Sequence, residues 1–186
     1  MANKKIRSTP TPEEVIAQRI KTLRSREEVK YFFQRLIILA AFVYLVFGVF
    51  FGFYVPHDND MYPRISAGDL LIYYRLSDSY SDQDIVVYTA GDTDYAGRIV
   101  ARPGDTVELG SDGEFRINGS RIFESGIFYT TAPYDTDVTY PLTLSEDEFF
   151  LLCDMREGGR DSRFFGAVKK SSIKGKVITL LRRSSL

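Results

Sequence analysis

The sequence predicts a mainly β domain that follows one N-terminal transmembrane helix. Two observations favour this fold class. A run of twenty residues near the N-terminus carries no charge, and the chain after it consists of short runs rich in β-branched and aromatic residues, separated by Gly, Asp, Asn and Ser. Of the 186 residues, 44% are hydrophobic and 14% aromatic, which suffices for a folded core and argues against a disordered chain.

Residues 1–35 form a basic segment that we expect to be cytoplasmic and largely helical. The segment holds nine Lys or Arg and four acids. Thr11 can cap a helix, Pro12 suits the first helical position, and Glu14, three residues after the cap, completes a capping box. The apolar residues that follow are scattered among charges, so this helix is expected to be exposed or to lie against lipid headgroups. A partner-binding role for it stays open.

Residues 36–55, "LIILAAFVYLVFGVFFGFYV", are expected to form a single transmembrane helix that contacts membrane lipid. The run contains no charge and no proline. At 1.5 Å per residue, twenty helical residues span about 30 Å, the thickness of the hydrocarbon core. The run is too long for a cleaved secretory signal and too uniformly apolar for a helix in a soluble core. Basic residues before it predict a cytoplasmic N-terminus in a single-pass cell-membrane protein.

Residues 56–186 are then an extracytoplasmic β domain, with fifteen basic and twenty-one acidic residues. In "RINGSR", Asn118 and Gly119 tolerate the positive φ of a tight hairpin turn, and "GSDGEF" indicates a second turn. Strands are expected within "DLLIYYRL", "DIVVYTA", "GRIVARPGDTVEL", "EFRINGSRIF", "EFFLLCD" and "KGKVITLL".

Cysteine and histidine content excludes several kinds of chemistry. Cys153 and His57 are the only residues of their types, so no intramolecular disulfide can form. Cys153 ends an apolar run and is expected to be a buried structural thiol. One His and one Cys give no metal-ligand spacing, so we expect no metal and no cofactor.

Three segments follow one another behind the predicted membrane helix: "DMYPRISAGDLL" (60–71), "YAGRIVARPGDTVEL" (95–109) and "CDMREGGRDSRFFGAV" (153–168). They resemble the three sequence boxes of type I signal peptidases. The first resembles Ser-Met-x-Pro-Thr-Leu-x-x-Gly-Asp, the second Lys-Arg-x-x-x-x-Pro-Gly-Asp, and the third Gly-Asp-x-Arg-x-x-Ser-x-Asp-Ser-Arg. The resemblance covers nearly all of residues 56–186 and implies a signal-peptidase-like antiparallel β domain.

The resemblance also implies that the reactive groups of that family are missing. In type I signal peptidases a serine attacks the scissile carbonyl, and a lysine of lowered pKa is its general base. The resemblance puts Asp60 at the serine position and Gly97 at the lysine position. It puts Asp58 where the family often has a serine that stabilises the oxyanion, and a carboxylate there would oppose the developing charge. Gly159 stands where the family has the serine that orients the lysine, so we expect no catalytic residue and no peptidase activity.

The third box keeps charged and polar residues, which we expect to form a scaffold of hydrogen bonds and ion pairs beneath the site. The alternative is ordinary surface charge. These residues are Asp154, Arg156, Asp161, Ser162 and Arg163.

The cleft of the family accepts an extended peptide as an added strand, so the resemblance also implies a groove for a peptide or partner. The alternatives are that these side chains are core or membrane-facing, and that another surface of the domain binds the partner. The corresponding positions are Tyr54, Pro56, Met61, Ile65, Val86, Tyr88, Tyr95 and Ala96.

The replacement of both reactive residues resembles the signal-peptidase-like pilus-assembly proteins of Gram-positive bacteria, which are non-catalytic accessory proteins or chaperones in sortase-dependent pilus polymerisation. The resemblance implies pilin subunits or a pilus-specific sortase as partners at the cell surface, and no nucleic acid. The sequence does not specify an oligomeric state. Two enzymatic alternatives stay open. One is an active membrane-bound type I signal peptidase with a displaced pair, drawn from Ser66, Lys169 and Lys170. The other is an acid pair, Asp58 and Asp60, on one face of a strand.

Overall fold

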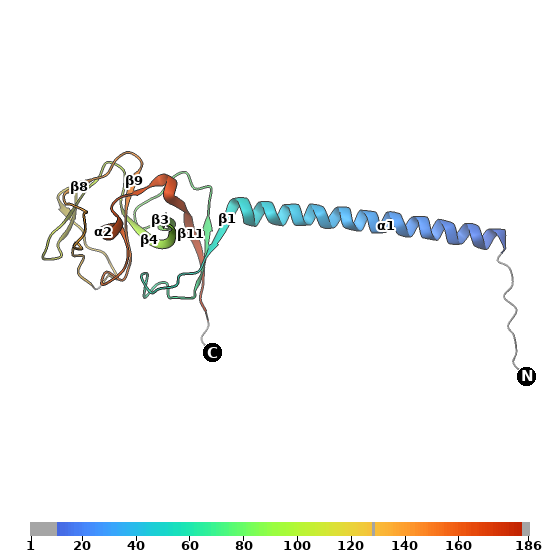
Figure 1. Ribbon diagram of the computed structural model, residues 1–186, viewed down its shortest axis with the longest axis horizontal. Helices are drawn as coiled ribbons and strands as arrows, with labels where there is room; N and C mark the ends of the chain where they lie inside the picture. Colours follow the sequence, from blue (N-terminus) through green and yellow to red (C-terminus); the bar gives the residue numbers. More distant parts are fainter. Residues whose placement is uncertain (1–10, 128, 184–186) are drawn as a thin grey trace, which may run out of the picture. The chain divides into compact units, whose positions relative to one another are not determined.

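The computed structural model describes residues 11–127 and 129–183. The chain divides after Val46 into two compact units, an N-terminal helical unit and a β domain. Figure 1 labels α1 in the helical unit and several elements of the β domain, among them β1, β4 and α2.

The helical unit contains α1 (Pro12–Tyr44), which begins at the predicted capping box. Thr11 N donates to Glu14 Oε2 (2.9 Å), and Glu14 N donates to Thr11 Oγ1 (3.4 Å). The helix continues as a π-helical turn, η1 (Leu45–Phe50). By length and composition this is the one helix in the described part of the chain that could cross a membrane, and none of the residues of α1 is buried.

The helical conformation ends at Phe50, five residues before the end of the predicted span at Val55. Residues 51–54 instead form β1 (Phe51–Tyr54), which pairs with β2 (Leu70–Tyr74). Gly52 lies opposite Tyr73, and a Cβ at Gly52 would overlap the Tyr73 ring. An uncharged aromatic run is compatible with helix or strand, so pairing with β2 decides its conformation.

The β domain is built from two antiparallel sheets, which confirms the mainly β fold. The larger sheet has the strand order β1-β2-β11-β3-β4-β9-β10, and the smaller has the order β7-β6-β5-β8. In Figure 1, β3, β4, β9 and β11 mark the centre of the larger sheet. Its further strands are β3 (Ile85–Ala90), β4 (Thr93–Ala101), β9 (Glu148–Leu152), β10 (Val168–Lys169) and β11 (Ile173–Leu181). The smaller sheet contains β5 (Thr106–Leu109), β6 (Phe115–Ile117), β7 (Ser120–Arg121) and β8 (Leu142–Thr143).

Each of the six predicted runs contains at least one strand. The predicted hairpin turn joins β6 to β7, and both Asn118 (φ 51°) and Gly119 (φ 76°) have positive φ. Two short helices, α2 (Ser162–Phe165) and η2 (Lys170–Ser172), lie between β9 and β11. The strands β8 and β10 were not predicted, because two residues are too short to show a periodic pattern.

Side chains of β4 alternate between separate buried clusters, as expected for a strand covered on both faces. Tyr95 and Ile99 belong to one cluster, Val100 packs with residues of the smaller sheet in a second, and Ala96 belongs to a third. The third cluster contains residues of the first box and Cys153, so β4 brings the three boxes together.

Candidate functional site

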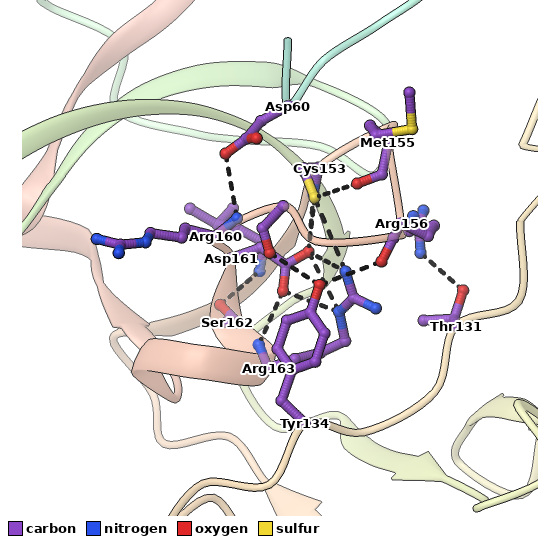
Figure 2. A network of polar contacts seen from close by, with 12 residues as sticks. Asp60, Thr131, Tyr134, Cys153, Met155, Arg156, Arg160, Asp161, Ser162 and Arg163 are labelled. Carbon is purple, nitrogen blue, oxygen red and sulfur yellow. Dashed lines mark hydrogen bonds and ion pairs between the residues drawn. The ribbon is translucent and has the colours of Figure 1, made fainter. Parts of the chain in front are cut away.

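Asp60 lies in the loop between β1 and β2, beside the loop formed by residues 155–160 (Figure 2). Met155 N donates to the carbonyl oxygen of Asp60 (2.8 Å), and Arg160 N donates to Asp60 Oδ2 (3.1 Å). The backbone and the side chain of Asp60 therefore both bind the third box. The predicted nucleophile position makes a structural contact between two loops.

Burial raises the pKa of the Asp60 carboxyl; the hydrogen bond from Arg160 N opposes this shift, and the charges of Asp58 and Asp161 add to it. Asp58 is exposed, and its Oδ1 accepts a hydrogen bond from Asp60 N (3.3 Å). Residues 58–60 form no strand, so Asp58 and Asp60 do not share the strand face that the alternative of an acid pair requires. The side chain of Asp58 binds the backbone of its neighbour.

Gly97 lies in β4 opposite Val86, and a larger residue there has little room. A Cβ at Gly97 would lie 3.0 Å from Tyr88 Cε1 and 3.4 Å from Leu151 Cβ. Tyr88 is completely buried, and its hydroxyl has no hydrogen-bond partner in the described part of the chain. The Tyr88 ring thus occupies space that a lysine at position 97 would need.

At Gly159, the space that a side chain would need is filled by Cys153. A Cβ at Gly159 would overlap Cys153 Sγ and lie 2.7 Å from Met155 O. As predicted, Cys153 is buried; its thiol lies 2.9 Å from both Met155 O and Asp161 Oδ2 and can donate to either (Figure 2). Burial and the charge of Asp161 raise the pKa of Cys153 far above its usual range, so the thiol stays protonated.

The second and third boxes are joined by a buried ion pair. Arg98 Nε and Nη2 donate to the two carboxylate oxygens of Asp154 (2.7 and 2.6 Å), and Arg98 Nη1 donates to Gln83 O (3.0 Å). Arg98 is 4% exposed and Asp154 2%, so the pair is shielded from solvent. The bidentate geometry fixes β4 against the loop that follows β9.

The other polar residues of the third box bind one another and β9. Asp161 caps α2 by accepting from Arg163 N (3.0 Å), and Arg163 Nη2 donates to Asp161 Oδ2 (2.8 Å). Ser162 Oγ accepts from Leu151 N (3.0 Å). Asp161, Ser162 and Arg163 are completely or almost completely buried. They are therefore interior groups and not ordinary surface residues.

Arg156 connects the third box to residues that sequence reasoning did not single out. Its Nη2 donates to Glu124 Oε2 (2.6 Å), and its Nη1 donates to Thr131 Oγ1 (3.1 Å). The Tyr134 hydroxyl lies within hydrogen-bond distance of the carbonyl oxygens of Arg156 (3.1 Å) and Gly159 (2.9 Å). A buried arginine requires an acid, but nothing local in the sequence indicates which one.

Predicted groove residues fall into two different buried clusters. Met61, Ile65 and Ala96 pack with Leu71 and Cys153, and Tyr54 lies against this cluster. Pro56 is also buried, and its carbonyl oxygen accepts from Gly68 N (2.9 Å). These residues join the first box to β4.

Val86, Tyr88 and Tyr95 belong to the other cluster, with Ile99 and Leu151 among its members. Val86 and Tyr88 have no exposed surface, so their assignment to a ligand groove is wrong. The reason is strand alternation: their side chains lie on the face of the sheet opposite to Ala96. Tyr95 is 8% exposed and belongs to the same core face.

Over its N-terminal half, β4 is paired with a described strand on one side only, and Thr93 is exposed there whereas residues 95–97 are buried. β4 pairs with β3 from Thr93 to Arg98, but it pairs with β9 only from Arg98 onward. In the described residues, 93–97 therefore have a strand neighbour on one side. A hollow of about 660 Å³ is lined by residues 53–55, 57 and 91–94, among others. Tyr54, which lines this hollow, donates its hydroxyl proton to Asp94 O (2.9 Å).

Of the residues considered for a displaced catalytic pair, Ser66 and Lys170 hydrogen-bond elsewhere. Ser66 N donates to Asp69 Oδ2 (2.9 Å), Lys170 Nζ donates to Asp78 O (2.7 Å), and Lys169 lies in β10. No hydrogen bond between described residues joins Ser66 to either lysine. In that same part of the chain, no group of three or more His, Cys, Asp or Glu is placed to hold a metal ion.

Comparisons with known proteins match this chain to signal peptidases. The model of the family "Signal peptidase, peptidase S26" matches residues 29–181. The chain is 33% identical over 141 residues to "Signal peptidase I" of Bacillus caldolyticus, covering 68% of this chain and 77% of that protein. It is 25% identical over 163 residues to "Inactive signal peptidase IA" of Staphylococcus aureus (strain COL), covering 82% and 90%. A crystal structure of a signal peptidase I from Enterococcus faecalis V583 is 29% identical, covers 54% of this chain and 97% of that chain, and gives a TM-score of 0.46.

Proposed function

Because the chain belongs to the signal peptidase family, peptidase S26, we propose that it is a membrane-anchored, non-catalytic member of that family. The observation that carries this proposal is that position 97 is a glycine packed against Tyr88 and Leu151, so a lysine there would require the Tyr88 ring to shift. A hydroxyl nucleophile needs a base within hydrogen-bond reach. The hydrogen bonds of Asp60 to the third box, and the name of the inactive S. aureus relative, support the same proposal.

We propose further that the protein is an accessory or chaperone in sortase-dependent pilus assembly. In this function it binds an extended segment of a pilin subunit or of a sortase. The resemblance to pilus-assembly proteins motivates the choice of partner. The start of β4, which is paired with a described strand on one side only and is exposed at Thr93, supports the mode of binding. An added strand would hydrogen-bond to the start of β4 at Thr93 and Asp94, beside the hollow that these residues and Tyr54 line.

The proposed topology places the N-terminus in the cytoplasm and the β domain outside, on the Gram-positive cell surface. The excess of Lys and Arg in residues 1–35, followed by the apolar part of α1 and η1, supports it. A β domain outside the membrane would meet pilin subunits where they are polymerised.

The absence of catalysis is tested with the full chain in lipid nanodiscs and a signal-peptide substrate. Signal peptidase I of B. caldolyticus is the positive control. We expect no cleavage by this chain at any pH near neutral. Turnover that disappears on Asp60→Ala would overturn the proposal, because it would make Asp60 a working acid.

The partner is tested by placing a photo-crosslinking amino acid at Thr93, which is exposed and lines the hollow. We expect crosslinks to a pilin subunit or a sortase in cells that assemble pili. Ser120, exposed in β7 of the other sheet, is the matched control position. Pilus polymers of unchanged length after deletion of the gene would refute the role in assembly.

A further inference from the structure

We propose that a cavity beside the smaller sheet binds a tyrosine side chain of a partner protein. This inference goes beyond the proposed function and does not depend on it. The cavity has a volume of about 290 Å³ and is here called the Glu124 cavity. Its lining residues lie between positions 113 and 131, and none of them lines the hollow at Thr93.

A carboxylate oxygen without a partner lies at this cavity. Glu124, one of the lining residues, has a side chain that is only 6% exposed. Its Oε2 accepts from Arg156 Nη2 (2.6 Å), but Oε1 is buried and has no hydrogen-bond partner among the described residues. A buried acceptor that is left unsatisfied lowers stability, so Oε1 indicates a ligand that donates a hydrogen bond.

The charges around Glu124 favour a neutral donor over a cation. The carboxylate is already paired with Arg156, whose side chain has no exposed surface, so these two buried charges compensate each other. A basic ligand would add a second cation to this pair without a second acid. The lining also contains Arg121, a further cation. We therefore infer that the ligand donates from an uncharged group.

Thr131 makes a hydroxyl the best match among neutral donors. Thr131 lines the cavity and is 6% exposed, and its Oγ1 accepts from Arg156 Nη1 (3.1 Å; Figure 2). Thr131 Oγ1 and Glu124 Oε2 are thus held side by side by the two terminal nitrogens of one guanidinium group. Because Thr131 is the acceptor in this contact, its hydroxyl proton can be donated to a ligand. A phenol can donate to Glu124 and accept from Thr131, whereas an indole only donates.

The apolar part of the lining suits an aromatic ring. Ile122 and Ile127 are partly buried, and two aromatic residues in the same lining are exposed, Phe123 by 81% and Tyr129 by 37%. A ring inserted between them would cover apolar surface that now faces water. Tyrosine combines such a ring with a hydroxyl for Glu124, and it is among the residues that most often anchor protein interfaces.

The chemistry is tested with the full chain in lipid nanodiscs, isotope-labelled on its isoleucine methyl groups, and with four small probes. p-Cresol represents the side chain of tyrosine, toluene that of phenylalanine, 3-methylindole that of tryptophan, and 4-methylbenzylammonium represents a cation. We expect p-cresol to shift the methyl signals of Ile122 and Ile127 with a Kd of about 1 mM, as for other ligands of this size. It should bind about tenfold more tightly than toluene, the effect of one hydrogen bond to a charged acceptor.

Matched tryptophan variants locate the binding. Thr130→Trp, at an exposed lining residue, should fill the cavity and abolish the p-cresol shifts. Thr93→Trp, the same change in the hollow beside β4, should leave p-cresol binding unchanged. Unchanged methyl signals of Ile85 and Ile99, which lie in the larger sheet and its adjoining core, would show that each variant is folded.

The probe series also contains the results that would overturn the inference. Equal affinity for toluene and p-cresol would remove the hydrogen bond to Glu124. Tighter binding of 4-methylbenzylammonium would indicate a basic ligand, and equal binding of 3-methylindole would remove the preference for a phenol. Shifts that persist in Thr130→Trp, or that are lost in Thr93→Trp, would place the binding elsewhere.

The nature of the partner is tested with phage-displayed heptapeptides, selected on the full chain in nanodiscs and counter-selected on Thr130→Trp. We expect the selected peptides to be enriched in tyrosine over phenylalanine and tryptophan, and to bind the Thr93→Trp variant as tightly as the unchanged chain. Enrichment of lysine or arginine would overturn the tyrosine assignment. Dimerisation of the chain that is lost in Thr130→Trp would overturn the partner protein and make a second copy of this chain the occupant.

Discussion

Restoring the two reactive groups should not restore a peptidase. In the double variant Asp60→Ser with Gly97→Lys, the serine loses the carboxylate that binds Arg160 N, and the lysine stem meets the Tyr88 ring 3.0 Å from its Cβ. If the roles implied by the family resemblance hold, Asp58 would also oppose the oxyanion, and Gly159 could not orient the lysine. We expect a folded but less stable protein without measurable cleavage.

The stability loss can be estimated from these contacts. Forcing a larger side chain into a filled core costs about 1–3 kcal/mol, and losing the hydrogen bond that Asp60 accepts from Arg160 N costs about 1 kcal/mol. The double variant should therefore lose about 2–4 kcal/mol. The remaining defects would lower the cleavage rate further, and their effects on the rate multiply. A single missing oxyanion donor costs about a hundredfold or more in rate.

The role of Tyr88 can be isolated by a double-mutant cycle. Gly97→Ala adds only the Cβ, and Tyr88→Leu removes the Cε1 atom that this Cβ would contact. Urea unfolding should show that Gly97→Ala is about 1 kcal/mol more destabilising with Tyr88 present than with Tyr88→Leu. Additive effects within about 0.3 kcal/mol, or cleavage of a signal-peptide substrate by Asp60→Ser with Gly97→Lys, would refute the steric argument.

Three further predictions concern stability and topology. Tyr88→Phe should raise the free energy of unfolding by about 1 kcal/mol, because it removes a buried hydroxyl without a partner. Tyr134→Phe should lower it by about 1 kcal/mol, because the Tyr134 hydroxyl lies within hydrogen-bond distance of two carbonyl oxygens. Equal effects of the two variants in urea unfolding would contradict this. Because the pKa of Asp60 is raised above 3.8 in the folded state, the ionised group destabilises the fold, so stability should fall as pH rises through the window above 3.8. Asp60→Asn keeps an acceptor for Arg160 N, so this variant should be more stable than the unchanged protein at neutral pH and should show a weaker dependence of stability on pH. An unchanged dependence would rule out Asp60 as its source. Protease added to intact protoplasts should remove residues 56–186, and full protection of this domain would disprove the topology.

Much of the fold could be predicted because its signals are local. The capping box of Thr11 and Glu14, the hairpin turn at Asn118 and the strand runs each depend on neighbouring residues. The end of the N-terminal apolar helix could not be located, because the apolar run Phe51–Tyr54 is compatible with either helix or strand. Its pairing with β2, which lies across a loop, decides the outcome.

The site could be predicted only in part, because the partners of buried polar groups are distant in sequence. The pairing of Arg98 with Asp154 spans 56 positions, and that of Arg156 with Glu124 spans 32. The burial of Val86 and Tyr88 depends on which face of the sheet is covered, and alternation alone does not specify that face. The spacing of the boxes predicted which segments meet, but it could not predict which side chains touch.

The buried pairs also explain how a chain of this family can keep its boxes without the reactive groups. Removing Arg98 would leave Asp154 as an unpaired buried charge, which typically costs about 3–5 kcal/mol, and the same reasoning applies to Asp161 and Arg163. Such a loss is a large part of the stability of a small domain. Position 97 has no such partner: it faces Tyr88, and a glycine there leaves no charge uncompensated. The ion pairs of the boxes therefore stabilise the fold whether or not a serine and a lysine are present, which agrees with the non-catalytic function proposed above.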